Sequence, residues 1–383
     1  MSIKSKILAL VAFTLLGSAE TISGQSLQGN QPNPHQPQQG RPAGASAPNW
    51  AQDLARRIQI DAYAQGGFTY EHTGGKDNNT FDIKRAMIIA ALPITDRWFA
   101  FFMHDFSSEV QEYYTSYRVT NNKAFNVKLG QFKNALTYEN SQPAFALEAI
   151  SLTSEGVGYL AGCGSDRLLG TQYGRDLGLE LFGETNSGKL KYTLAVMNGQ
   201  GVNKKDGNNE KDFIGKLEYR PTSELNFIVS GQLGRGHAIE RSIYNPDIQV
   251  GDNYKRNRWT AGFAYNSRPI RLRGEYVEGK DGDVTSRGAY VTTAIPVAPK
   301  LELVGSYDFF NYNIKAHMDQ HKAILGFQYW FYKNCRFQVQ YVYKSASLQD
   351  HSFVTPGGDV VNSKVFTHGA NHAILCQMQV RLK

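Results

Sequence analysis

From about Ile58 to its last residue, the chain repeats short segments in which apolar and polar residues alternate. Between 225 and 233, for example, Leu225, Phe227 and Val229 alternate with polar residues. Successive side chains of a strand point to opposite faces, so each segment can set one face against lipid and the other against water. About sixteen such segments of roughly ten residues predict an all-β fold, a transmembrane antiparallel β-barrel of about 16 strands.

The gaps between these segments alternate in length. The expected strands begin near Ile58, Phe81, Trp98, Tyr113, Phe125, Tyr173, Leu190, Phe213, Leu225, Trp259, Ile270, Ala289, Leu301, Ala323, Phe337 and Ala373. Every second gap is short, as at 93–97, 186–188 and 333–335, whereas the others are mostly longer, as at 71–79, 236–255 and 345–368. Bacterial barrels have short periplasmic turns and longer outer loops, so both chain ends are expected in the periplasm.

The longest gap, at 132–172, is the third outer loop. It carries apolar residues, among them Leu136, Phe145 and Ile150, which need a surface to cover. Long loops without regular structure are usually functional, and a barrel of sixteen strands leaves an aqueous lumen. We therefore expect this loop to fold into the lumen and narrow it, with packing over the outer rim as the alternative.

The N-terminus predicts export. An apolar run at 7–17 follows Lys4 and Lys6 and precedes small residues, which is typical of a signal peptide and too short for a spanning helix. We expect residues 1–24 to be that peptide, 25–57 to be a flexible Gln- and Pro-rich periplasmic lead, and 58–383 to be the barrel. Removal of the peptide changes the formal net charge of +7 to about +6.

Cysteine and histidine give little support for a metal site or an enzyme. Cys163, Cys335 and Cys376 allow at most one internal disulfide, and their positions favour none. Six histidines fall near expected outer loops, where polar residues collect in any barrel: His237, His317, His321, His351, His368 and His372. A rim protease or a metal site is the weaker interpretation, and we expect neither catalytic residues nor a cofactor.

Several motifs resemble those of the phosphate-selective porin O/P family. They lie at 127–133 (VKLGQFK), 138–139, 174–183 (GRDLGLELFG) and 197–201 (MNGQG), with earlier likenesses at 81–86 and 105–107. The resemblance covers about Ile58 to Gly201. It implies a homotrimeric outer-membrane porin in a Gram-negative bacterium, an inward third loop, basic residues along the path, and phosphate or polyphosphate as solute.

A porin selects solutes by pore width and by the sign of the charges along its path. The strand phase turns Lys128 inward between Val127 and Leu129. Lys84 and Arg85 are adjacent, so only one of them is expected to face the lumen, and the resemblance favours Arg85. The expected pore-lining, anion-binding residues are Arg85, Arg118, Lys128, Lys133, Arg271 and Arg273. The alternative is that these cations pair with inward carboxylates: Asp61, Glu180, Glu218, Glu275 and Glu302.

The sequence thus favours a water-filled, anion-selective diffusion channel. Its expected partners are small anions such as phosphate, outer-membrane lipid and lipopolysaccharide, and two further copies of the chain. Nucleic acid is not expected, because the basic residues are scattered and no binding motif is present. A non-conducting structural or adhesive outer-membrane barrel is the alternative, since it would share every strand.

Overall fold

The computed structural model describes residues 56–166, 168–268, 270–354 and 360–382. The expected signal peptide and nearly all of the expected lead lie outside the described residues. The barrel belongs to the unit that begins at Gln59.

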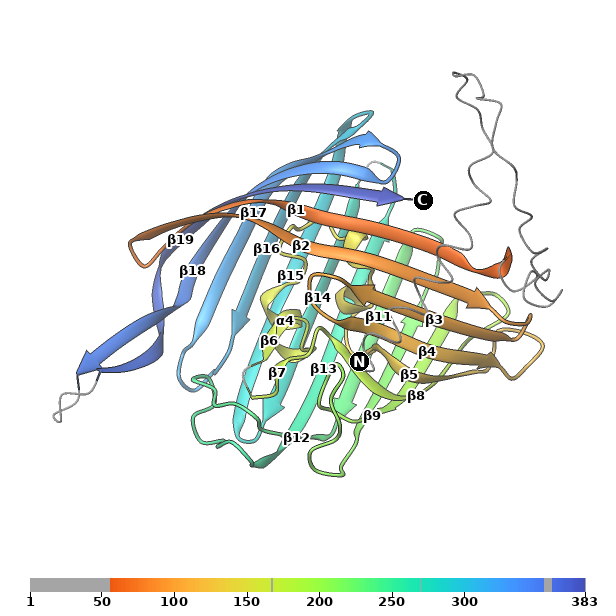
Figure 1. Cartoon of the computed structure of the whole chain (residues 1–383), viewed down its shortest axis with the longest axis horizontal. Helices are drawn as coiled ribbons and strands as arrows, with labels where there is room; N and C mark the ends of the chain where they lie inside the picture. Colours follow the sequence, from red (N-terminus) through yellow and green to blue (C-terminus); the bar gives the residue numbers. More distant parts are fainter. Residues whose placement is uncertain (1–55, 167, 269, 355–359, 383) are drawn as a thin grey trace, which may run out of the picture. The chain divides into compact units, whose positions relative to one another are not determined.

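Within the described ranges, sixteen strands pair antiparallel with their neighbours in chain order, and β1 pairs with β19 to close the barrel (Figure 1). The strands are β1 (Gln59–Thr73), β2 (Lys76–Pro93), β3 (Trp98–Asp105), β4 (Val110–Arg118), β5 (Asn126–Lys133), β8 (Arg175–Glu184), β9 (Leu190–Met197), β10 (Asp212–Tyr219), β11 (Leu225–Leu233), β13 (Asn253–Asn266), β14 (Arg271–Asp281), β15 (Val284–Ala298), β16 (Leu301–Asn311), β17 (Asp319–Tyr332), β18 (Cys335–Val354) and β19 (Val360–Leu382). A short strand, β12 (Arg235–His237), pairs with the outer end of β13. The predicted barrel and strand number are confirmed.

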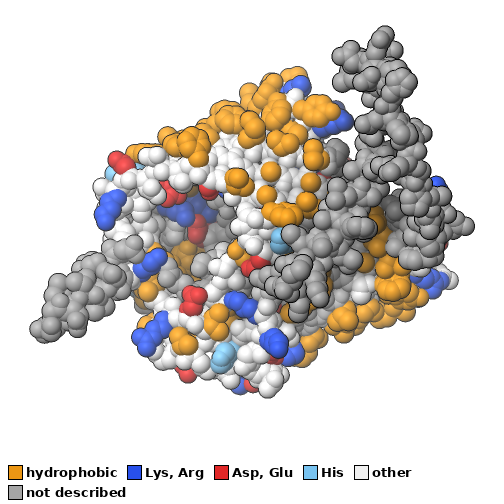
Figure 2. All heavy atoms as spheres, viewed as in Figure 1, with side chains coloured by type: hydrophobic (Ala, Val, Ile, Leu, Met, Phe, Trp, Pro, Cys, Tyr) orange, Lys and Arg blue, Asp and Glu red, His pale blue; other side chains and the backbone are white. Residues whose placement is uncertain are grey.

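The two faces of each strand differ as the alternation predicts. On β11, Phe227, Val229 and Leu233 are exposed on the outside of the barrel, whereas Ser230 and Gln232 are buried inside. Hydrophobic side chains spread over the outer surface, and charged side chains are visible inside a hollow on the face drawn in Figure 2. An apolar exterior with a polar interior is the arrangement that lets a closed sheet sit in lipid.

Several strands extend further outward than the sequence predicted. The segments 71–79 and 345–368 were expected to be loops, but β1 pairs with β2 as far as Thr73 and Lys76, and β18 pairs with β19 as far as Val354 and Val360. The prediction was wrong because it followed apolar alternation. Backbone pairing in a hairpin continues beyond the apolar belt without needing it.

The long third loop, 134–174, contains most of the remaining regular structure. Its elements are α3 (Tyr138–Ser141), the 3-10 helix η1 (Ala144–Ala146), α4 (Glu155–Leu160), β6 (Ser165–Asp166) and β7 (Gly170–Thr171). None of the helices in the described ranges is long and apolar enough to cross a membrane.

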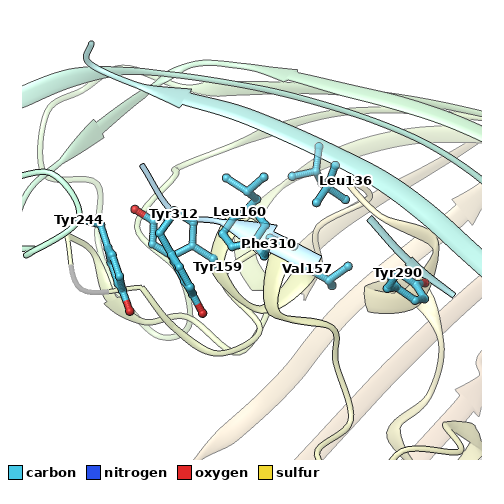
Figure 3. Close-up of a cluster of buried hydrophobic side chains, with 10 residues drawn as sticks. Leu136, Val157, Tyr159, Leu160, Tyr244, Tyr290, Phe310 and Tyr312 are labelled. Carbon is cyan, nitrogen blue, oxygen red and sulfur yellow. The ribbon is translucent and has the colours of Figure 1, made fainter. Parts of the chain in front are cut away.

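The loop packs against the inside of the barrel through a cluster of apolar and aromatic side chains (Figure 3). Val157 and Leu160 of α4 and Leu136 pack with wall residues such as Phe310 of β16. Gly156 makes the close approach possible, because a Cβ there would lie 2.5 Å from a methyl group of Val277 on β14. This contact holds α4 against the inner face of β14 to β16.

Candidate pore constriction

Two capped helices set the course of the third loop. The side chain of Thr137 accepts a hydrogen bond from the first turn of α3, and that of Ser154 does so for α4. Thr and Ser are favoured at such positions because their oxygen satisfies an N–H that lacks a partner in the helix. The caps place Glu139 and Glu155 in the first turns of these helices.

The loop is tied to the inner face of β13 to β18, which we call the anchor wall. The Arg273 guanidinium pairs with Glu148 and, at 3.2 Å, with Glu139. In return, the carboxylate of Glu275 accepts the backbone N–H groups of Tyr138 (2.7 Å) and Glu139 (2.9 Å). A buried charge is costly unless it is paired and hydrogen-bonded, and the Arg273 guanidinium is paired with two loop carboxylates, although its Nε has no hydrogen-bond partner among the described residues.

A second group of charges fixes the start of α4. Glu155 pairs with Lys322 and with Lys344, each at 3.0 Å, and Lys322 also lies 3.3 Å from Asp308. Burial alone would raise the pKa of Glu155, but the two ammonium groups hold that pKa well below its usual range. The carboxylate is therefore ionised at neutral pH.

The other side of the loop faces two cavities along the inner face of β1 to β5 and the start of β8, which we call the pore wall. The outer cavity, about 580 Å³, reaches the turn after β3 at Ser107 and Ser108. The inner cavity, about 360 Å³, extends to the opposite barrel end at Gln59. On the loop side, residues of 139–164 line the outer cavity and residues of 141–145 line the inner one, so the loop borders both cavities.

The two cavities meet at three residues that line both of them: Lys133, Ala144 and Arg175. Arg175 is paired with Glu112 at 2.9 Å. Lys133 donates to the backbone carbonyl of Gln142 and forms no ion pair with any carboxylate in the described part of the chain. The junction of the two cavities therefore carries one basic side chain, that of Lys133, without a carboxylate partner in the described part of the chain.

Arg85 lies on the outer cavity, and so does Lys84. A bulge opposite Gln65 and Gly66 leaves Lys84 without a cross-strand partner, because Gln65 pairs with Arg85 and Gly66 with Ile83. A bulge places two residues against one, so neighbouring side chains can share a face. The expectation that only one of this pair can face the lumen was wrong. Neither cation forms an ion pair with a described carboxylate, and Arg85 donates to Gln65 at 3.5 Å.

Lys128 and Arg118 line neither cavity. The Lys128 ammonium pairs with Glu180 at 2.6 Å and lies 4.7 Å from the centre of the Phe132 ring. Arg118 is at the periplasmic end of β4, where its guanidinium donates to the carbonyl of Asp96 in the turn before β3. Strand phase predicts which side of the sheet a side chain faces. It predicts neither how far along the barrel axis the side chain lies nor which group it binds.

Arg271 and Arg273 belong to the anchor wall. Arg271 makes two hydrogen bonds of 2.8 Å to Glu302, and Arg273 holds the loop carboxylates described above. They line a separate cavity of about 260 Å³ between the loop and β13 to β15. Both arginines therefore pair with carboxylates, as the alternative in the sequence analysis stated. Their partners are Glu302, Glu139 and Glu148, and Glu275 forms an ion pair with neither.

Sequence reasoning missed Arg175 and the anchoring carboxylates of the loop. Arg175 opens β8 within the motif at 174–183, directly across the sheet from Lys133, and that register signal was available once β5 and β8 were paired. Glu139, Glu148 and Glu155 have no periodicity that marks them.

The cysteines are free thiols in this structure. Burial raises the pKa of the Cys163 thiol to about 12, and its sulfur lies 3.0 Å from the Asn140 side chain. A thiol with so high a pKa is a poor nucleophile. Among the described residues, no group of three His, Cys, Asp or Glu side chains is placed to hold a metal ion.

Neither known protein families nor curated proteins gave a match to this chain. Solved structures did. An anion-selective porin from Comamonas acidovorans has a TM-score of 0.61 at 13% identity, covering 85% of this chain and 99% of that one. OmpT of Vibrio cholerae, in a trimer form, has a TM-score of 0.55 at 13% identity, covering 84% of this chain and 99% of that one. OprB of Pseudomonas putida has a TM-score of 0.58 at 10% identity, covering 87% of this chain and 96% of that one. The fold is therefore that of Gram-negative outer-membrane porins.

Proposed function

We propose that this outer-membrane barrel is a water-filled diffusion channel that prefers anions. The observation that carries the proposal is the position of Lys133, an unpaired cation at the junction of two cavities that follow one another along the pore wall. Lys84 and Arg85 line the outer cavity above it, also without carboxylate partners in the described ranges. Asp82, Asp105 and Glu139 also line the outer cavity, and Glu139 is paired with Arg273. We infer that the cations without carboxylate partners give this path its preference for anions.

Electrostatic energies indicate that cations in the constriction act on a passing anion more strongly than cations on the outer surface do. A fixed charge attracts an anion about 4 Å away by roughly 1 kcal/mol in water and by about 4 kcal/mol in a partly dehydrated passage. Charges on the outer surface are screened beyond about 8–10 Å in physiological salt. The excess of Lys and Arg over the whole chain therefore matters less than the few cations in the narrow path.

The test is the reversal potential of the purified full chain in a planar bilayer under a salt gradient. Lys133→Met should shift the potential towards zero and Lys133→Glu should shift it towards cation preference. Lys205→Met is the matched control, because Lys205 is exposed in the loop between β9 and β10 and should leave the potential unchanged. A cation-preferring wild type, or equal shifts in all three variants, would contradict the proposal.

Phosphate or polyphosphate as the specific solute is a prediction from the family resemblance alone. It is tested in the same bilayer by the current that phosphate carries, or by its block of chloride current. A channel without conductance, in protein that resists unfolding until it is boiled in detergent, would instead favour a structural or adhesive barrel.

We further propose that the barrel assembles as a homotrimer in contact with lipopolysaccharide. Support comes from the shared fold, since V. cholerae OmpT was solved in a trimer form. Cross-linking in native outer membranes should give a species of three chains. A monomer under conditions that preserve other porin trimers would contradict the assembly.

A further inference from the structure

The pore wall below the constriction is apolar on the face that lines the lumen. Ile89 of β2 pairs with Met103 of β3, and Ala91 pairs with Phe101, so four apolar side chains form two adjacent rows. All four line the inner cavity. Tyr63 of β1 also lines it, from the neighbouring strand.

The inner face of the anchor wall is apolar where the loop packs on it, as at Val277 and Phe310. Elsewhere it carries buried amides, among them Gln328 of β17 and Gln338 and Gln340 of β18. A barrel lumen is ordinarily polar because it holds water. Apolar side chains along a water-filled path gain nothing from water, so they call for another explanation.

Packing of the third loop explains part of this apolar lining of the inner cavity. Phe145 of η1 packs edge-on against Tyr63, with 5.4 Å between ring centres, and the Arg381 guanidinium lies 3.6 Å from the Phe145 ring centre. Tyr63 and Met103 are buried by this packing. Ile89, Phe101 and Phe145 are only partly buried, and all three line the cavity. Anchoring therefore leaves an apolar surface that still faces the path.

The charges around the same cavity are nearly all neutralised. Arg381 pairs with Asp61 at 2.5 Å, and Arg175 pairs with Glu112 at 2.9 Å. Lys133, at the top of the cavity, is the cation that lacks a carboxylate partner among the described residues. The inner cavity thus combines one unpaired positive charge with an apolar lining.

From this combination we propose that the preferred solutes are organic anions with an apolar or aromatic body, such as aromatic carboxylates. The carboxylate binds at Lys133, and the body lies against Ile89, Phe101 and Phe145. Ligand sites typically join a largely apolar lining to a few convergent polar groups, and this cavity has that form. A phosphate ion would bind at Lys133, but it has no apolar group to make contact with Ile89, Phe101 and Phe145.

This inference rests on the proposed anion channel, and the experiment separates the two. In a planar bilayer with the full chain, chloride current is recorded while acetate, benzoate or inorganic phosphate is added. Benzoate should block at concentrations roughly tenfold lower than acetate, the ratio given by about 1.4 kcal/mol of apolar contact. This comparison uses the wild type and does not depend on any variant.

Variants then locate the site. Ile89→Gln with Phe101→Gln should reduce the benzoate preference severalfold while chloride selectivity is kept. Phe99→Gln is the matched control, because Phe99 lies on the same face of β3 but does not line the cavity. Ile89→Thr alone replaces the double variant if that one does not insert.

The outcomes discriminate between the two proposals. Anion selectivity with equal block by acetate and benzoate would overturn the inference and leave the proposed function standing. A benzoate preference that survives in the cavity variants would overturn the assigned site. Cation selectivity in the wild type would overturn the proposed function itself.

Discussion

The pore wall and the anchor wall differ in how their basic residues are partnered. On the anchor wall, Arg271, Arg273 and Lys322 are paired with carboxylates of the loop or of neighbouring strands. The pore wall has such pairs too, at Arg175 and Lys128, but Arg85 and Lys133 line cavities there and form no ion pair with a described carboxylate. Basic side chains on the inner face thus differ in partner: some are bound to carboxylates, and a few line a cavity without one.

Three acidic residues of the loop, Glu139, Glu148 and Glu155, are bound to cations of the anchor wall. Glu148 and Glu155 are bound to cations of the anchor wall, so their charge is neutralised away from the path. Glu139 shares Arg273, although it also lines the outer cavity. A channel can therefore carry similar numbers of acidic and basic residues inside and still prefer anions.

The largest expected effect on conductance comes from removing the part of the third loop that lies between the two walls. Replacing residues 142–153 by a short Gly-Ser linker should raise single-channel conductance severalfold, because these residues line both cavities. Selectivity should fall at the same time, since a wider path is better hydrated. Single-channel recording measures both, and unboiled migration in detergent confirms that the variant barrel is folded. Unchanged conductance in a folded variant would show that the loop does not restrict the path.

A smaller effect is expected from breaking one anchor. Lys322→Met leaves Glu155 and Asp308 as buried carboxylates with one cation fewer, and breaking a buried pair costs about 3–5 kcal/mol. The docked loop should therefore open far more often, seen as faster amide hydrogen exchange in α4 and as noisier single-channel current.

The control is Lys280→Met, whose exposed pair with Asp283 at 3.7 Å should contribute no more than about 1 kcal/mol. If exchange in α4 rises equally in both variants, the buried cluster does not hold the loop.

The sequence predicted the strands because alternation is a local property. Each strand shows its two faces in its own residues, as on β11 with Phe227 and Val229 outside and Ser230 inside. The ladders beyond the apolar belt were missed for the same reason, since polar hairpin ends carry no such alternation. The segments that begin near Phe81 and Trp98 do not alternate clearly between apolar and polar residues, and the structure explains why. Ile89 and Phe101 make the lumen face of β2 and β3 apolar too.

The sequence offered pairing with inward carboxylates as an alternative, but it could not tell which cations would be paired. Lys128 and Lys133 were both expected to line the pore, yet one pairs with Glu180 and the other lines two cavities. The partners of Arg273 come from a loop more than a hundred positions earlier. Neither spacing nor strand phase contains that information.

This difference between Lys128 and Lys133 is itself testable. Lys128→Met combined with Glu180→Gln removes both members of a pair that is already neutral. The reversal potential should change much less than in Lys133→Met, with both measured in the same salt gradient. The single Lys128→Met exposes the charge of Glu180 and should shift the potential towards cations. If the double variant shifts it as far as Lys133→Met does, then pairing does not decide which cations act on the solute.

The smallest effect is expected at Arg118, which lies at the periplasmic end of β4 and lines neither cavity. Its guanidinium donates to the carbonyl of Asp96 at the periplasmic end, so its role is to join two turns. Arg118→Gln keeps a donor and should leave conductance and reversal potential unchanged, with at most about 1 kcal/mol lost from stability. Bilayer recording and thermal unfolding in detergent measure the two properties. A clear loss of anion preference would mean that selectivity extends to the periplasmic mouth and is not set where the two cavities meet at Lys133.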